Sequence, residues 1–422
     1  MTGCAPARPS SPTRSFRGLG AGPGVRGVYR GHKLKKMPIR PVICLVSACV
    51  LPTLARAEPP DFFQLRAGAG VEHDSNVLRA PSHEQSDNIG VLSVGVNVDR
   101  SYSLQHFRLD AEAASYRYSN QSNLNYNTIN YSAGWDWKFT PRLHGVLSAD
   151  RRQFRDISDS VAGQLEIGRR TERTELFEGI YDIDGAWRAL AGVSHTSSST
   201  TVPVSWDASP SIRSARVGAG YQFASGSSIF ARLRRGDGEY RAPLTPGAPA
   251  DFRETEADAA LKWILTGKTS LDAQLGHLKR THSDAPQRDF SGPVGRATVT
   301  WNATGKTSVV AGVLRYLSSS GLDTGGHVES TRWFIGPVWK ATAHTSFNAR
   351  YDRTSRNWRD IVAGAPESGR HDVIETTSIG VDWEPRRFVT VTGSVRGERV
   401  KSNVIGTSYR NTAVAAGVRF NF

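Results

Sequence analysis

Charged residues recur at every second position in several segments of this chain. Arg108, Asp110 and Glu112 form one such series, and Arg232 and Arg234 form another. A guanidinium group can hold a carboxylate or a sulfate through two parallel hydrogen bonds, so such a series suits the binding of anionic or hydroxyl-rich molecules. The same charges would equally suit pairing of arginine with aspartate or glutamate on neighbouring segments. The sequence leaves both interpretations open.

Catalytic chemistry has little support in the sequence. It contains no G-x-S-x-G, H-E-x-x-H or P-loop motif. Gly218-Ala219-Gly220 lies within an alternating segment and opens no helix, so it is not a nucleotide site. We predict no catalytic residue, cofactor or metal site, and no enzyme activity. The histidines near segment ends lack an evident serine or aspartate partner, which leaves a membrane hydrolase as a less favoured alternative: His106, His144, His195, His277 and His344.

The positions between the charges are apolar, and this alternation defines the elements that hold the charged residues. In residues 127–139, for example, Ile129, Trp135 and Phe139 share one face, while Thr128 and Asp136 share the other. A period of two indicates a β-strand, because successive side chains point to opposite faces. About eighteen such segments, with a range of sixteen to twenty, predict an all-β transmembrane antiparallel barrel.

In such a barrel the apolar face meets lipid and the charged face lines a water-filled lumen. The residues that this parity predicts to line the pore are Arg66, Arg108, Asp110, Glu112, Arg216, Arg232, Arg234, Asp258, Arg296, Arg332, Arg350, Arg396 and Arg419. The chain contains no run of eighteen apolar residues, so the sequence predicts no transmembrane helix.

The connections between the alternating segments fall into two classes that alternate along the chain. Short turns such as Thr266-Gly267-Lys268 alternate with longer polar stretches such as 156–170, 236–252 and 355–371. Short periplasmic turns and long extracellular loops are typical of a membrane barrel. A soluble β-sandwich would not sort its loops in this way.

Aromatic residues collect beside the short turns. They predict a girdle at the periplasmic membrane interface, made of Trp135, Trp137, Trp187, Trp263, Trp301, Trp339 and Trp383. The last segment, 409–422, resembles the C-terminal strand by which outer-membrane barrels are recognised and inserted. Its outward face ends in Val418, Phe420 and Phe422, which we predict to be the insertion signal. This strand must pair with the one near Phe62 to remove both sheet edges.

The first 57 residues differ from the rest of the chain. Residues 1–36 are rich in Gly, Pro and Arg, and we expect a disordered N-terminal extension there, with Met37 as the true start. Residues 37–57 have the form of a signal peptide, with a basic start, an apolar stretch and Ala55-Arg56-Ala57 as the cleavage site. The alternatives are one long disordered leader or a lipoprotein box at residues 46–49. Residues 58–422 would then form the barrel.

Removal of this segment changes the charge balance. Ten of the 53 Lys and Arg residues and none of the 39 Asp and Glu residues lie in 1–57, so 43 basic residues remain against 39 acidic ones. A nucleic-acid function therefore loses the support of net charge. All three cysteines, Cys4, Cys44 and Cys49, also lie in this segment, so the mature chain would have no thiol chemistry.

Four stretches resemble a known family. Residues 62–65, 72–79, 100–105 and 116–120, including the series Asp74-Ser75-Asn76-Val77-Leu78-Arg79, are similar to the EpsL-type family. Its members are exosortase-associated outer-membrane proteins encoded with exopolysaccharide biosynthesis genes. The resemblance extends from Phe62 to Phe422 and implies a barrel that exports polysaccharide across the outer membrane. It implies no catalytic residues.

The leading hypothesis is a passive outer-membrane channel for an extracellular polysaccharide, coupled to an envelope synthesis and export machine. The expected partners are outer-membrane lipid and lipopolysaccharide, polysaccharide, periplasmic export components and the barrel-assembly machinery, with no nucleic acid. A general or solute-selective diffusion porin is the alternative.

Overall fold

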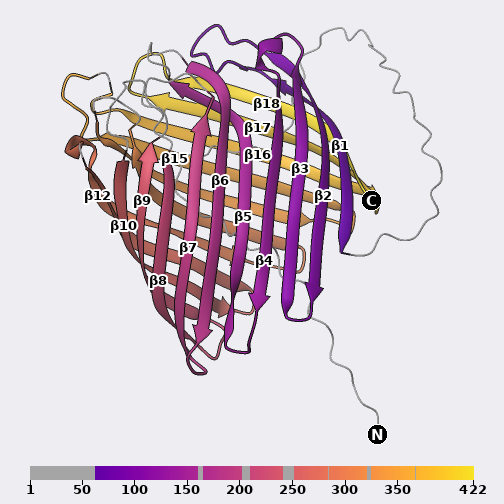
Figure 1. Cartoon of the computed structure of the whole chain (residues 1–422). Coiled ribbons are helices and arrows are strands. Elements are labelled where there is room, and N and C mark those ends of the chain that lie inside the picture. Colours follow the sequence, from indigo (N-terminus) through magenta and orange to yellow (C-terminus); the bar gives the residue numbers. More distant parts are fainter. Residues whose placement is uncertain are drawn as a thin grey trace.

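The computed structural model describes residues 62–159, 165–201, 210–240, 251–283, 285–320, 325–365 and 367–422. In these ranges the chain forms one 18-stranded antiparallel sheet that closes into a barrel (Figure 1). No helix in the described ranges is long and apolar enough to cross a membrane. The predicted extension 1–36 and signal peptide 37–57 lie outside the described residues.

The strands follow one another around the barrel in chain order. The first nine are β1 (Phe63–Asp74), β2 (Asp87–Tyr102), β3 (Gln105–Tyr118), β4 (Tyr126–Lys138), β5 (Leu143–Asp159), β6 (Leu165–Asp182), β7 (Trp187–Thr200), β8 (Pro210–Gln222) and β9 (Ser228–Tyr240). The second nine are β10 (Asp251–Thr266), β11 (Thr269–His282), β12 (Phe290–Trp301), β13 (Thr307–Ser319), β14 (His327–Lys340), β15 (Thr345–Arg359), β16 (His371–Arg386), β17 (Val389–Ser402) and β18 (Tyr409–Asn421). Two short 3-10 turns, η1 (Ser122–Leu124) and η2 (Pro286–Arg288), lie in the loops.

The first and last strands close the barrel. β1 pairs with β2 on one side and with β18 on the other (Figure 1). At the end of this seam the Phe422 amide donates to the Leu65 carbonyl at 2.8 Å, and the Leu65 amide donates to Phe422 at 2.9 Å. Closure leaves no unpaired sheet edge. The predicted strand class, strand number and β1–β18 pairing are confirmed.

The two faces of the wall differ in residue type and in exposure. Apolar side chains such as Val71 and Leu275 are 63% and 67% exposed. On the charged face, Asp352 and Glu254 are each only 2% exposed. A concave surface crowds its side chains against one another, while a convex surface spreads them apart. The charged face is therefore the lumen face, and the apolar face is the one that meets lipid.

The two ends of the barrel differ in their connections. At one end tight hairpins join the strands, as between Thr266 and Thr269, and at the other end the connections are longer (Figure 1). The predicted loop boundaries were wrong in several places. β5 and β6 remain paired as far as Asp159 and Leu165, inside the expected loop 156–170, and β15 extends to Arg359, inside 355–371. The antiparallel pairing continues beyond the apolar zone. Both faces of the strands meet water there, so polar side chains replace the apolar alternation.

Candidate functional site: the charged lumen wall

Ion pairs cover much of the lumen wall. Arg66 on β1 donates to Asp110 on β3 at 2.8 Å and crosses β2 at Gly95, where a Cβ atom would lie 3.2 Å from the Arg66 Nη2. Arg108 lies 2.7 Å from Asp136 on the next strand. The predicted pore-lining arginines therefore do not all project freely into the lumen. Several lie along the wall and join strands, which is the structural role that the sequence left open.

The same arrangement continues around the barrel. Pairs that join neighbouring or next-neighbouring strands, with their closest N–O distances, are Arg188–Asp182 (2.7 Å), Arg216–Glu178 (3.3 Å), Arg232–Asp258 (2.6 Å) and Arg296–Asp272 (3.9 Å). Side chains directly opposite on the same face of an antiparallel sheet lie close together, so alternation brings these partners within reach.

A second cluster lies on β9, β10 and β11. Arg234 contacts Glu254 at 3.1 Å and Glu256 at 2.6 Å, and Glu254 also accepts a hydrogen bond from the Arg280 Nε at 2.9 Å. The Arg280 guanidinium lies 4.0 Å from the centre of the Phe252 ring. Arg280 and Glu254 are buried, so this cluster stabilises the wall. Glu254 and Arg280 are not among the predicted pore-lining residues, although both share the parity of those residues.

Two arginines share one carboxylate on β14 and β15. The Arg332 Nη2 lies 2.6 Å from one oxygen of Asp352, and the Arg350 Nε lies 2.9 Å from the other. The Arg350 guanidinium also lies 4.3 Å from the centre of the Phe334 ring, which restricts its orientation further. The side chain of Asp352 is 2% exposed, against 35% for Arg350. The guanidinium groups therefore lie between this carboxylate and the lumen.

Arg396 on β17 also lies nearer the lumen than the carboxylate that it pairs with, Glu398. It forms an ion pair with Glu398, whose side chain is 5% exposed against 15% for Arg396. The Arg79 Nε lies 3.5 Å from the same carboxylate, and the Tyr409 hydroxyl donates to it at 3.0 Å.

We call Arg332, Arg350 and Arg396 the arginine patch. Ser378 on β16 lies directly opposite both Arg350 and Arg396 in the strand registers, so the patch spans four adjacent strands.

Arg419 differs from the other predicted pore-lining arginines. It is exposed, and it lies opposite Gly68 on β1 and Thr390 on β17. No carboxylate oxygen of the described residues lies within 4 Å of it. Glu112, the remaining predicted pore-lining residue, is half-buried opposite Gly95 and Asn130.

The β1–β2 loop is locked onto the barrel seam by the series Asp74-x-Asn76-x-x-Arg79. Asn76 is fully buried, and its side-chain amide donates to the carbonyl groups of Ala80 at 2.8 Å and Arg410 at 2.9 Å. Arg79 donates to both oxygens of Asp74 at 2.8 Å. Burial alone would lower the pKa of Arg79, but the Asp74 and Glu398 carboxylates raise it above its ordinary value. These residues tie β1 to β17 and β18, a role that the sequence resemblance did not assign.

Replacement of Asn76 by alanine should destabilise the barrel by about 2–3 kcal/mol. The change leaves the carbonyl of Arg410 and both backbone polar groups of Ala80 without their Asn76 partner in a partly buried place, and polar groups that lose their partner away from water carry a desolvation cost. The measurement is the free energy of unfolding in urea, in detergent micelles. Gln85→Ala in the same loop removes only an exposed hydrogen bond to Gln121 and should cost less than about 0.5 kcal/mol. Equal losses in the two variants would contradict the buried-lock interpretation.

The predicted girdle tryptophans occupy three kinds of environment. Trp187, Trp301, Trp339 and Trp383 are each about half exposed at the hairpin end of the wall. Trp137 is 4% exposed, because its ring lies against Gly145 and Gly179 and stacks on Phe177 at 5.7 Å.

Two further tryptophans of the predicted girdle are partly buried. Trp135 donates its indole N–H to Gln105 at 2.9 Å, and Trp263 makes an edge contact with Phe223. Within the described ranges, no group of three His, Cys, Asp or Glu residues could hold a metal ion.

Half of the chain, residues 209–422, matches the family model described as "Putative beta-barrel porin 2". The chain belongs to this family. The match extends from β8 to β18 and includes the whole arginine patch. Membership in a porin family is consistent with the prediction that the chain is not an enzyme, and it supports an outer-membrane location. It supports the diffusion-porin alternative better than polysaccharide export, and it gives no support to the EpsL-type resemblance.

Solved structures of other outer-membrane proteins are similar to this porin. OpdK from Pseudomonas aeruginosa is 11% identical with a TM-score of 0.46, over 85% of this chain and 99% of that one. OccAB3 from Acinetobacter baumannii is 10% identical with a TM-score of 0.45, over 86% and 99% of the two chains. OpdO from Pseudomonas aeruginosa is 14% identical with a TM-score of 0.44, over 86% and 96%. No curated protein matches the chain.

Proposed function

We propose that this porin is a solute-selective diffusion channel of the outer membrane that favours small anionic solutes. The observation that carries the proposal is the order of the charges at the arginine patch. The carboxylates of Asp352 and Glu398 lie against the wall, and the guanidinium groups of Arg350 and Arg396 lie nearer the lumen. Buried carboxylates keep the arginines in place, while the charge that a passing solute meets is positive.

This geometry suits transient binding of carboxylates, sulfates or phosphates. Each guanidinium has five N–H donors, so donors remain for a solute after the wall carboxylate has been satisfied. A patch of the lumen wall with one sign of accessible charge raises the local concentration of the opposite ion. Because Asp352 is shared by Arg332 and Arg350, this part of the wall has one positive charge in excess. Passage also requires binding that is weak enough for release, which exposure to water provides.

Conductance of the purified porin in a planar lipid bilayer tests the proposal. Under a tenfold gradient of potassium chloride, the reversal potential should show higher permeability to chloride than to potassium. In liposomes, a sugar carboxylate should enter faster than the neutral sugar of equal size. A cation-selective reversal potential, or equal entry of the two sugars, would disprove anion selectivity while leaving the porin class intact.

Export of a polysaccharide stays a prediction, and a gene deletion separates it from diffusion. If the chain is a diffusion porin, the deletion strain should secrete unchanged amounts of polysaccharide and should take up small anionic solutes more slowly. Loss of secreted polysaccharide with unchanged solute uptake would favour export and would count against our proposal.

A further inference from the structure

The outer face of the barrel changes from apolar to basic near the loop end. On β15 the outward residues Phe347, Ala349 and Tyr351 are followed by Arg353. On β8 the outward residues Val217 and Ala215 lead to Arg213. The same change occurs on several other strands. We call the result the outer basic belt, represented by Arg117, Arg173, Arg213, Arg353, Arg399 and Arg410, all of which are exposed.

Two pairs of arginines in this belt lie directly opposite one another, whereas Arg353 and Arg213 lie opposite the carboxylates of Glu375 and Asp237. Arg399 on β17 is the register partner of Arg410 on β18, and Arg151 on β5 is the partner of Arg173 on β6. Like charges in directly opposite positions of a sheet repel each other. A wall that retains such pairs on an exposed face is suited to an anionic ligand that neutralises both members.

The protein itself neutralises only part of the belt. Arg315 and Arg253 have carboxylate partners, Glu329 at 2.9 Å and Asp237 at 3.2 Å. By contrast, among the described residues no carboxylate oxygen lies within 4 Å of Arg173, Arg399 or Arg410. At the hairpin end, the half-exposed Trp187, Trp301, Trp339 and Trp383 follow the apolar residues of the wall.

The height of the belt on the barrel wall indicates which kind of anion it would meet in the membrane. The belt begins within one or two outward positions of the last apolar residue, which places it at the headgroup region of the membrane. The longer loops of a bacterial barrel face the cell exterior, so this headgroup region belongs to the outer leaflet. The outer leaflet of this membrane presents phosphorylated glycolipids, whose phosphates arginine binds in a bidentate manner.

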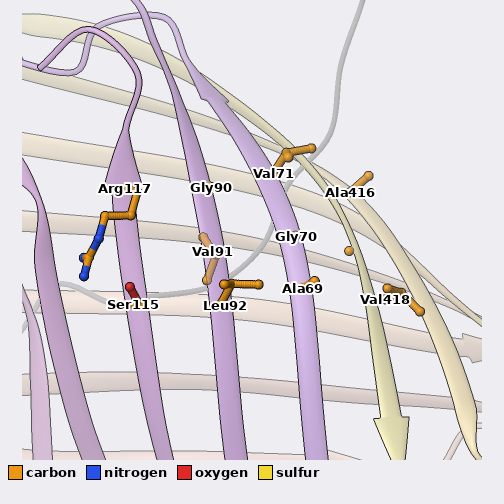
Figure 2. A pocket seen from close by; sticks show the side chains of 11 residues that line it. Ala69, Gly70, Val71, Gly90, Val91, Leu92, Ser115, Arg117, Ala416 and Val418 are labelled. Atoms are coloured by element: carbon orange, nitrogen blue, oxygen red, sulfur yellow. The ribbon is translucent and has the colours of Figure 1, made fainter. Parts of the chain in front are cut away.

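An apolar groove of about 530 Å³ on the outer face provides a second feature of the site. It crosses the seam between β18, β1, β2 and β3, and it is lined by small and apolar side chains such as Ala69, Leu92 and Val418 (Figure 2). Arg117 lies on the wall of this groove, two residues closer to the loop end of β3 than Ser115 (Figure 2). The Arg117 side chain points away from the seam, and its guanidinium donates to the Tyr126 carbonyl on β4 at 3.2 Å. A hydrocarbon slot beside a row of exposed arginines matches an acyl chain attached to a phosphorylated sugar.

We propose that the outer basic belt and the seam groove bind a phosphorylated glycolipid of the lipid A class. Its phosphates would lie between opposed arginines, and one acyl chain would occupy the groove. The proposal concerns the outer face alone and does not depend on which solute passes through the lumen.

The test uses the purified full-length porin and bis-phosphorylated lipid A. The belt variant is Arg173→Gln/Arg399→Gln/Arg410→Gln, which removes three exposed arginines: one from the Arg151–Arg173 pair and both from the Arg399–Arg410 pair. The matched control is Arg142→Gln/Arg386→Gln/Arg387→Gln, which removes three exposed arginines at or beside the hairpins of the other end. The melting temperature in detergent is measured without lipid, with lipid A, and with dephosphorylated lipid A.

We expect lipid A to raise the melting temperature of the wild type and of the control, and to raise that of the belt variant by less than half as much. Its affinity for the belt variant should be at least tenfold weaker. Without lipid, the belt variant should melt at the wild-type temperature or higher, because repulsion between opposed arginines has been removed. A full shift in the belt variant, an equal shift with dephosphorylated lipid A, or a lipid-free belt variant that melts below the wild type would overturn the proposal.

Discussion

Deletion of Phe422 should abolish assembly of the barrel in the membrane. This residue forms the last backbone rung of the seam, with hydrogen bonds in both directions to Leu65 at 2.8 and 2.9 Å. Its ring is more than half exposed on the lipid face and lies 6.4 Å from the ring of Phe420. The deletion removes the terminal aromatic residue that the insertion signal is predicted to require, and it shortens the pairing that eliminates the sheet edge. We therefore expect at least a tenfold loss of folded barrel in the outer membrane.

The measurement is the fraction of porin in outer-membrane fractions that migrates as a folded barrel on unheated gels. Arg419→Ala is the matched control, because Arg419 lies three residues away on the lumen face and is exposed. Phe422→Tyr should also assemble, since it retains the aromatic ring and both backbone bonds. Normal assembly of the deletion variant would show that the final residue is not part of the insertion signal.

Arg350→Gln/Arg396→Gln should reduce the preference for anions by about five- to tenfold. The substitutions remove two charges that face the lumen, and each charge interacts with an ion at about 4 Å by roughly 1 kcal/mol in water. The choice of these two arginines keeps the wall intact. Asp352 retains Arg332 at 2.6 Å, and Glu398 retains Arg79 at 3.5 Å, so neither buried carboxylate is left without an arginine.

The measurement is the ratio of chloride to potassium permeability at low and at high salt. The effect should be largest near 10 mM salt and small at 1 M, since the screening length falls from about 30 Å to about 3 Å. Arg353→Gln is the matched control, because it removes an exposed charge from the outward face of the same strand. If the control changes selectivity as much as the double variant does, the arginine patch is not the selective element.

The strand pattern was largely predictable from local sequence. Ile129 to Phe139 alternate because every residue of a strand must face either lipid or water, and this constraint acts on each residue separately. For the same reason the number of strands and the closing role of Tyr409–Asn421 could be predicted without knowledge of any contact. The loop ends were less predictable. Polar residues such as Asp159 and Arg359 continue to form strands where the lipid constraint no longer acts.

The partners of the lumen charges were not predictable in the same way. Parity predicted the lumen face for Arg332, Arg350 and Arg396, but it could not show that Asp352 and Glu398 lie between them and the wall. Burial of those carboxylates depends on the register of β14 to β17 and on the crowding of a concave surface.

The sequence by itself therefore determined the barrel, its two faces and its closing strand, because a period of two is a local property of the chain. Only the tertiary structure decided which arginines hold the wall together, which ones face the solute, and that Asn76 locks the seam to the backbone of Arg410. Those contacts join residues up to several hundred positions apart, and their geometry is set by strand register, which no local pattern specifies.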